Sequence, residues 1–288
     1  MGVVVNTNIS SISAARTLAT NRTDLQTAME RLSSGKRINS AKDDAAGMAV
    51  AAKMHADIRS LNQAVRNTND AISLVNTYDG AAAEIENILV RMRELAVQSK
   101  NGTYQDADRT NADYEYTALK SEIKRIADVT TFNRQLLANT STDTNFSFYV
   151  GSDVAKGGNT VTFSAGSLNL NGSATGAAVG TSLKTIVSAG LSGTDTGASA
   201  AVAALDTAIS ALAGKRANAG ALVNRLEHTV ANLMNVSQRL QEAASGIEDA
   251  DYAAESAALA RGMVLQQAGT AMLAQANQQP QYILTLLK

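Results

Sequence analysis

The chain has 288 residues, and 25 lysines and arginines against 26 aspartates and glutamates give it a formal net charge of −1. This length allows one or two domains with a sizeable core, and a near-zero charge without a basic run argues against binding to nucleic acid. Cysteine is absent, which excludes disulfides, thiolate metal sites and cysteine nucleophiles. One proline, no tryptophan and 4% aromatic residues are typical of long uninterrupted helices rather than of a compact enzyme.

The first predicted element is a helix over residues 9–32. Its apolar side chains recur at helical spacing and are Ile9, Ile12, Leu18, Leu25, Met29 and Leu32. Small polar residues interrupt this row, so the helix is marginal on its own. Polar residues also interrupt the apolar positions after Met1, and the first basic residue is Arg16. We therefore expect no secretory signal peptide.

A long helix is predicted over residues 44–99. Two rows of residues recur every seven positions, one with Ala51, Ile58, Val65 and Ile72, the other with Met54, Leu61, Thr68, Val75, Ala82 and Leu89. Such rows indicate the seam of a coiled coil. The first row breaks at Asp79, after which the pattern continues in a shifted phase. Asp43 and Asp44 stand just ahead of the helix, and we expect them to cap its N-terminus rather than to form a catalytic pair.

A second helix is predicted over about residues 105–129, and the composition changes after it. Half of the 20 glycines lie between residues 138 and 197. Residues 146–150 and 160–163 alternate in polarity around a turn, which predicts a β-hairpin. From residue 171 the sequence has low complexity and favours a loop or a small surface elaboration.

The most regular pattern lies in the second half of the chain. Seven residues fall at an unbroken spacing of seven, namely Ala198, Leu205, Leu212, Ala219, Leu226, Leu233 and Leu240. The companion row is apolar except at Arg216 and Ser237. The pattern predicts a helix roughly 70 Å long at 1.5 Å per residue. A helix of that length must lie along a partner of similar length, and the helix over 44–99 is one.

The last predicted helix covers residues 253–287. Its apolar residues are Val264, Leu265, Met272, Leu273, Ile283, Leu284, Leu286 and Leu287. Residues 262–287 carry no charge, but six glutamines and Pro280 make the segment costly in a bilayer, so no membrane insertion is expected. We expect the two terminal helices to pair with each other and to need neighbouring subunits for stability.

Catalytic and metal sites are not predicted. The two histidines, His55 and His228, lack partners at metal-ligand spacing, and the acidic run 248–251 lacks the spacing and glycine of a calcium loop. We interpret that run as a solvated junction between domains. No cofactor is expected, and the chain is not expected to be an enzyme.

Four motifs in the correct order resemble those of bacterial flagellin. They are ERLSSGKRINSAKDDAAG at residues 30–47, RMRELAVQ at 91–98, NRLEHT at 224–229 and LAQANQQP at 273–280. The resemblance covers about residues 1–137 and 198–288. One departure is Arg134 after Phe132 and Asn133, where the family often has glycine, because arginine tolerates a positive φ poorly.

The resemblance implies a mainly α fold of long antiparallel coiled-coil helices with a small β-hairpin region. Residues 1–44 with 246–288 would form an inner core that faces the lumen of a filament. Residues 45–170 with 198–245 would form an outer core, and 171–197 a short variable surface segment. Each core would pair an N-terminal with a C-terminal part of the chain.

The resemblance also implies function and partners. The chain would be exported unfolded by the flagellar type III apparatus and would polymerise with copies of itself into the extracellular filament that drives motility. A hook–filament junction protein is the alternative. An export chaperone, the filament cap and hook-junction proteins would be further partners. Arg91, Leu95 and Glu122 match family positions that contact Toll-like receptor 5, although the same face is expected to serve mainly in packing between subunits.

Overall fold

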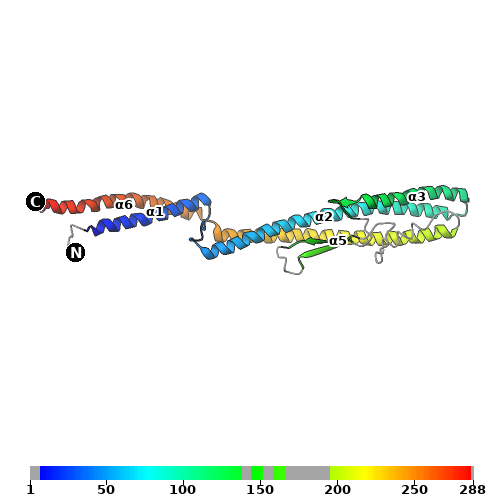
Figure 1. The fold of residues 1–288 in the computed structure, drawn as a ribbon, viewed down its shortest axis with the longest axis horizontal. Helices are drawn as coiled ribbons and strands as arrows, with labels where there is room; N and C mark the ends of the chain where they lie inside the picture. Colours follow the sequence, from blue (N-terminus) through cyan, green and yellow to red (C-terminus); the bar gives the residue numbers. More distant parts are fainter. Residues whose placement is uncertain (1–6, 138–143, 152–157, 166–194, 287–288) are drawn as a thin grey trace. The chain divides into compact units, whose positions relative to one another are not determined.

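The computed structural model describes residues 7–137, 144–151, 158–165 and 195–286. Five helices lie in this part of the chain: α1 (Ile9–Ser34), α2 (Ala45–Ser99), α3 (Asp106–Val129), α5 (Asp195–Glu248) and α6 (Tyr252–Leu286) (Figure 1). Four short strands accompany them: β1 (Thr131–Phe132), β2 (Gln135–Leu136), β3 (Thr144–Tyr149) and β4 (Thr160–Ala165). The predicted mainly α class is confirmed. Residues 171–194 of the predicted variable segment and Leu287 lie outside the described residues.

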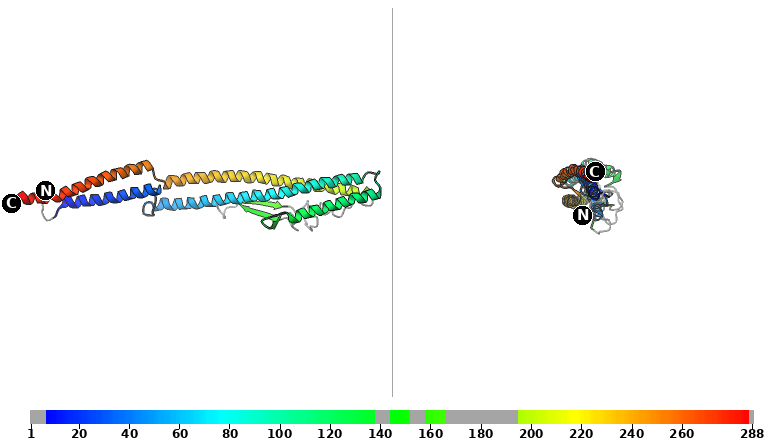
Figure 2. Two further views of the ribbon diagram at one scale, coloured as in Figure 1. Left: turned by 90° about the horizontal axis from the view of Figure 1, so that it is seen from above. Right: turned by 90° about the vertical axis from the view of Figure 1, so that its left-hand side faces the viewer.

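Contacts divide the chain into two compact units. The terminal unit contains residues 1–58 and 238–288, and the central unit contains residues 59–237. Helices α2 and α5 contribute residues to both units. In the terminal unit α1 lies beside α6, as both Figure 1 and Figure 2 show.

The heptad rows form the core of the central unit. All members of the α5 row from Ala198 to Leu233 are buried, and Val75, Ala82 and Leu89 of α2 are buried with them. Ile123 of α3 adds to the same core. Burial of these side chains removes apolar surface from water, and this is the main stabilising contribution to the unit. The predicted coiled-coil pairing of the two long helices is therefore present.

One helix among the described residues, Gly197–Glu248, is long and apolar enough by composition to cross a membrane. Four of its leucines, Leu205, Leu212, Leu222 and Leu226, pack in the core of the central unit. Core helices meet the same compositional test, so the finding is weak evidence for a membrane span.

The predicted hairpin is confirmed as β3 and β4, which pair antiparallel with Phe146 opposite Phe163. Phe163 packs against Tyr78 of α2 with an edge-to-face geometry and a centroid distance of 5.3 Å. Both strands thus place aromatic side chains against the core of the central unit.

A second hairpin, β1 and β2, was not predicted. Each strand has two residues, and Asn133 and Arg134 form the turn with φ values of 48° and 65°. Asparagine adopts this left-handed region readily, whereas arginine pays a steric cost for its Cβ. The structure therefore places Arg134 in the conformation that favours glycine.

Arg134→Gly is expected to raise the free energy of unfolding of the central unit by about 1 kcal/mol, because it relieves the strain of a left-handed non-glycine residue. The Arg134 side chain is exposed, so few contacts are lost. Urea denaturation followed by circular dichroism measures the change. Arg134→Ala keeps the Cβ and is the control that should show no gain. Equal stability of the glycine and alanine variants would show that the turn is not strained.

Tyr116 of α3 holds a buried polar group that the sequence did not single out. Its side chain is fully buried, and its hydroxyl has no hydrogen-bond partner among the residues that the structure describes. Desolvation, together with the nearby charge of Asp113, raises the pKa of this phenol well above its usual value. A buried hydroxyl without a partner lowers stability.

Tyr116→Phe is expected to raise the free energy of unfolding by about 1 kcal/mol at neutral pH, because it removes the unsatisfied hydroxyl. Because burial raises the pKa of the phenol in the folded state, the unfolded state ionises first, and the free energy of unfolding falls as pH rises above the pKa of the unfolded phenol, near 10. The variant should therefore be less sensitive to alkali. Thermal melts at pH 7 and pH 11 measure both effects. A lower melting temperature at pH 7, or an unchanged alkaline sensitivity, would contradict this interpretation.

Candidate assembly surface on the terminal helices

Side-chain caps define the ends of the terminal helices. The Ser11 amide donates to Asn8 Oδ1 at the start of α1, and α1 ends at Gly35, which has a φ of 71°. At the start of α6, the Ala253 amide donates to Asp251 Oδ1 over 2.9 Å. The side chains of Asn8 and Asp251 each accept from a backbone amide that the helix leaves free, so they set where α1 and α6 begin, whereas the Gly35 amide donates to the Arg31 carbonyl at the end of α1.

Two glycines of α6 allow close approach of α1. A Cβ at Gly269 would lie 3.1 Å from Leu18 Cδ1, and a Cβ at Gly262 would lie 3.3 Å from Leu25 Cδ1. The glycines are seven residues apart, as are the two leucines. Each leucine of α1 therefore packs onto a glycine of α6, a fit that larger residues would disturb.

Polar contacts reinforce the same alignment of α1 and α6. The side-chain amide of Asn21 donates to the Gly262 carbonyl over 2.9 Å. The amide of Asn8 donates to the Ala276 carbonyl over 2.7 Å. Near the other end, Arg31 Nη1 lies 2.9 Å from Glu255 Oε1. The pair is thus aligned antiparallel by specific contacts rather than by apolar burial alone.

Most of the predicted assembly residues are not covered by this pairing. Leu18 is buried, and Leu25, Leu32 and Leu273 are half-buried. The exposed members are Ile9, Ile12, Met29, Val264, Leu265 and Met272. Met263, which the sequence analysis did not select, is also exposed. For Ile283, Leu284 and Leu286 only the helical backbone is described.

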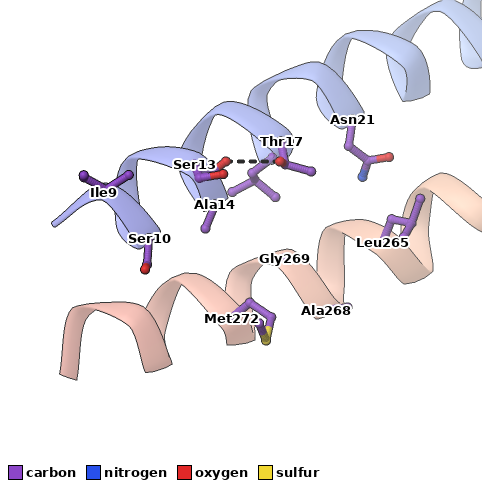
Figure 3. A pocket seen from close by; sticks show the side chains of 11 residues that line it. Ile9, Ser10, Ser13, Ala14, Thr17, Asn21, Leu265, Ala268, Gly269 and Met272 are labelled. Carbon is purple, nitrogen blue, oxygen red and sulfur yellow. Dashed lines mark hydrogen bonds between the residues drawn. The ribbon is translucent and has the colours of Figure 1, made fainter. Parts of the chain in front are cut away.

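An apolar groove of about 590 Å³ runs between the two helices. Figure 3 shows Ile9, Ala14 and Thr17 on the α1 side and Leu265 and Met272 on the α6 side. In the described part of the terminal unit, only α1 and α6 line this groove. The terminal helices therefore present an extended apolar surface with an unfilled groove.

The two linkers of the terminal unit are joined to each other. The Arg37 amide donates to the Glu248 carbonyl over 2.6 Å, and the Ala250 amide donates to the Gly35 carbonyl over 3.0 Å. These backbone bonds tie the α1–α2 linker to the α5–α6 linker, so the two linkers form one joint.

Charged groups at this joint have structural partners. Lys36 Nζ and His55 Nε2 each lie 3.0 Å from Glu248 Oε2, and hydrogen bonds from His55 and Lys36 lower the pKa of this carboxyl. Asp44 Oδ1 accepts from the Gly47 amide over 2.8 Å and caps α2. The Glu248 side chain is largely buried, so the solvated junction expected for residues 248–251 is only partly correct. Among the described residues, no group of three or more His, Asp or Glu side chains has the arrangement of a metal site.

Two family models match this chain. The model described as the bacterial flagellin N-terminal helical region matches residues 5–142, and the model described as the bacterial flagellin C-terminal helical region matches residues 202–287. The chain belongs to the bacterial flagellin family.

Relatives of similar length support this membership. Flagellin from Halalkalibacterium halodurans is 43% identical over 286 residues, which cover 99% of this chain and all of that protein. The flagellar filament 30.7 kDa core protein of Treponema maltophilum is 37% identical over 293 residues and is likewise covered in full. A solved flagellin structure from Bacillus cereus is 32% identical and aligns with a TM-score of 0.47 over 58% of this chain and 88% of that one.

The predicted receptor-facing residues of this flagellin have different surroundings. Arg91 is exposed and binds Glu94 and Glu115 at 3.0 and 2.9 Å. Glu122 is paired with Arg125 at 2.6 Å. Leu95, by contrast, is only 3% exposed and belongs to the core of the central unit. The resemblance led us to expect Leu95 on a surface that a receptor can contact. Its burial corrects this expectation, because a core side chain is not available to a receptor.

Proposed function

We propose that this flagellin polymerises into the flagellar filament through the exposed apolar faces of α1 and α6. The observation that carries the proposal is the exposure of these faces. Val264 is 65% exposed and Met272 is 62% exposed, although α1 and α6 are already aligned with each other by specific contacts. Neighbouring subunits would cover these side chains and the groove. Burial of apolar area contributes roughly 25 cal/mol per Å², so several such side chains per subunit supply a substantial driving force.

The uncharged C-terminal part of α6 suits such an interface. Residues 262–287 carry no charged side chain, so packing them between subunits buries no unpaired charge. Contacts between different surfaces of identical subunits produce an open helical assembly when the rotation does not close. We assign residues 1–44 with 246–288 to the inner core of the filament and residues 45–170 with 198–245 to the outer core.

The route to the filament follows from the same chemistry. A helix pair with little buried apolar area is marginal before assembly and gains its stability on docking. A chain without disulfides can pass an export channel unfolded, which fits type III export with a chaperone before assembly at the filament cap. The filament is extracellular, and the subunit acts as a structural protein rather than an enzyme.

The filament subunit is favoured over the junction protein. The relatives reported above are named as flagellin or as a filament core protein, and they match the chain over its whole length. Recognition by Toll-like receptor 5 is a secondary proposal that now rests on Arg91 and Glu122 alone, since Leu95 is buried. Any such partner must compete with the ion pairs that both residues already form.

Electron microscopy of purified protein, before and after short filament seeds are added at neutral pH, tests the proposal. The full chain should form long filaments, and a chain that lacks residues 253–288 should form none. Filaments from the truncated chain would overturn the role of α6. A full chain that never elongates the seeds would favour the junction role.

A further inference from the structure

The apolar seam between α2 and α5 in the central unit is repetitive. On α5 the buried residues at intervals of seven are Ala198, Leu205, Leu212, Ala219, Leu226 and Leu233. A shift of one helix along the other by one heptad, about 10 Å at 1.5 Å per residue, would keep every site of this row apolar, although it would exchange leucine with alanine at the sites of Ala198 and Ala219. The apolar character of the row therefore does not by itself exclude the shifted alternatives.

The polar exceptions in the two heptad patterns meet each other. Arg216, an exception in the companion row of α5, lies between Asp79 and Glu86 of α2, which are themselves seven residues apart. Arg216 Nε is 2.9 Å from Asp79 Oδ1, and Nη1 is 2.6 Å from Glu86 Oε2. All three side chains are partly buried, with exposed fractions between 27% and 39%. Ion pairs in such surroundings are screened less than those on an open surface.

Two further contacts share this antiparallel alignment. Arg93 Nε lies 2.6 Å from Asp206 Oδ1. Ser237, the other exception in the companion row of α5, donates to Asn62 Oδ1 over 3.3 Å. Polar contacts thus occur at three levels along the pair and agree on one register.

Each shift by one heptad brings like charges together. If α5 moves so that Arg216 lies between positions 86 and 93 of α2, it meets Arg93. If α5 moves the other way, Asp206 moves from Arg93 to Glu86. Both shifts also remove at least one carboxylate from Arg216. A like-charge contact in a partly buried seam disfavours both alternatives.

We infer that Arg216, Asp79 and Glu86, together with the Arg93–Asp206 pair, select the register of α2 and α5 against shifts by one heptad. The cluster acts as a specificity element, because the apolar rows supply stability and the charges supply alignment. The backbone hydrogen bond from Arg37 to Glu248, at the end of α5, also opposes a shift of α5 along α2. Loss of the cluster is therefore expected to produce a second population of molecules in which α2 and α5 are shifted by one heptad, while other molecules keep the observed register.

The absence of cysteine allows a clean distance measurement on the full chain. Spin labels are attached at Asn87→Cys on α2 and Asn235→Cys on α5, two exposed positions outside the cluster. The test variant carries Arg216→Leu, Asp79→Leu and Glu86→Leu, which complete the apolar rows. The matched control carries Lys124→Ala and Asp128→Ala, which remove an ion pair within α3. Pulsed electron paramagnetic resonance gives the distance distribution, and a thermal melt is recorded for each protein.

The labelled parent and the control should show one distance. The triple-leucine variant should melt at the same or a higher temperature and show a second distance displaced by about 10 Å. An ion pair that only stabilises the fold would lower the melting temperature and leave one distance. Arg216→Gln is measured in parallel and should show the second distance at lower population, so the test does not depend on the triple variant folding. One unshifted distance in the folded variants would overturn the inference.

Discussion

Val264→Glu combined with Met272→Glu is expected to abolish elongation of filament seeds while leaving the monomer folded. Both side chains are more than half exposed before assembly, so the charges remain hydrated in the monomer. In a filament they would be buried without partners, and burial of an unpaired charge is strongly unfavourable. Turbidity and electron microscopy measure elongation, and circular dichroism reports the fold of the monomer.

The control for this experiment is Val264→Leu combined with Met272→Leu. These changes keep the surface apolar and similar in volume, so seeds should elongate nearly as they do with the parent chain. Normal elongation by the double-glutamate variant would show that this face of α6 stays in water after assembly. That result would remove the main support for the proposed interface.

Leu95→Ala is expected to lower the free energy of unfolding of the central unit by about 3 kcal/mol, because truncation of a buried leucine leaves a cavity. The side chain is 3% exposed and lies in the main core. Chemical denaturation followed by circular dichroism measures the loss. Any effect of this substitution on receptor recognition is then expected to follow from the loss of stability.

Arg91→Ala is the matched comparison, one turn away on α2. Arg91 is exposed, and its bonds to Glu94 and Glu115 lie in water, where ion pairs contribute little. Its replacement should leave stability nearly unchanged. If Arg91→Ala destabilised the unit more than Leu95→Ala, the assignment of Leu95 to the core would be wrong.

The long helices were predictable because their pattern is local and repeated. Heptad spacing in residues 44–99 and 198–240 indicated α2 and α5, and the α5 row from Ala198 to Leu233 is buried as the spacing predicted. The first α2 row is only half-buried at Val65 and Ile72, beside a buried row of Ala64, Ala71 and Tyr78 that the spacing did not select. Polar alternation indicated the β3–β4 hairpin for the same reason. The capping role of Asp44 also followed from its place ahead of a helix.

Other features depend on contacts between distant residues, which one sequence does not reveal. Asp79 and Arg216 each interrupted a heptad row, yet only the fold shows that they bind each other. The packing of Leu18 on Gly269 likewise needs both helices in place. The β1–β2 hairpin is too short to give a periodic signal. Its turn has Arg134 at a position with positive φ, where glycine is the residue that usually indicates a turn in a sequence. Leu95 was assigned to the receptor-contacting residues from a sequence motif, and a motif does not show whether a side chain is buried.

Hydrogen–deuterium exchange on monomer and on seeded filament tests most directly whether α1 and α6 form the assembly interface. The backbone amides of residues 9–34 and 252–286 should exchange rapidly in the monomer and become strongly protected in the filament, because docking covers a marginal helix pair. Core amides of the central unit should be protected in both states. Equal protection of α1 and α6 in monomer and filament would contradict the proposal that these helices carry assembly.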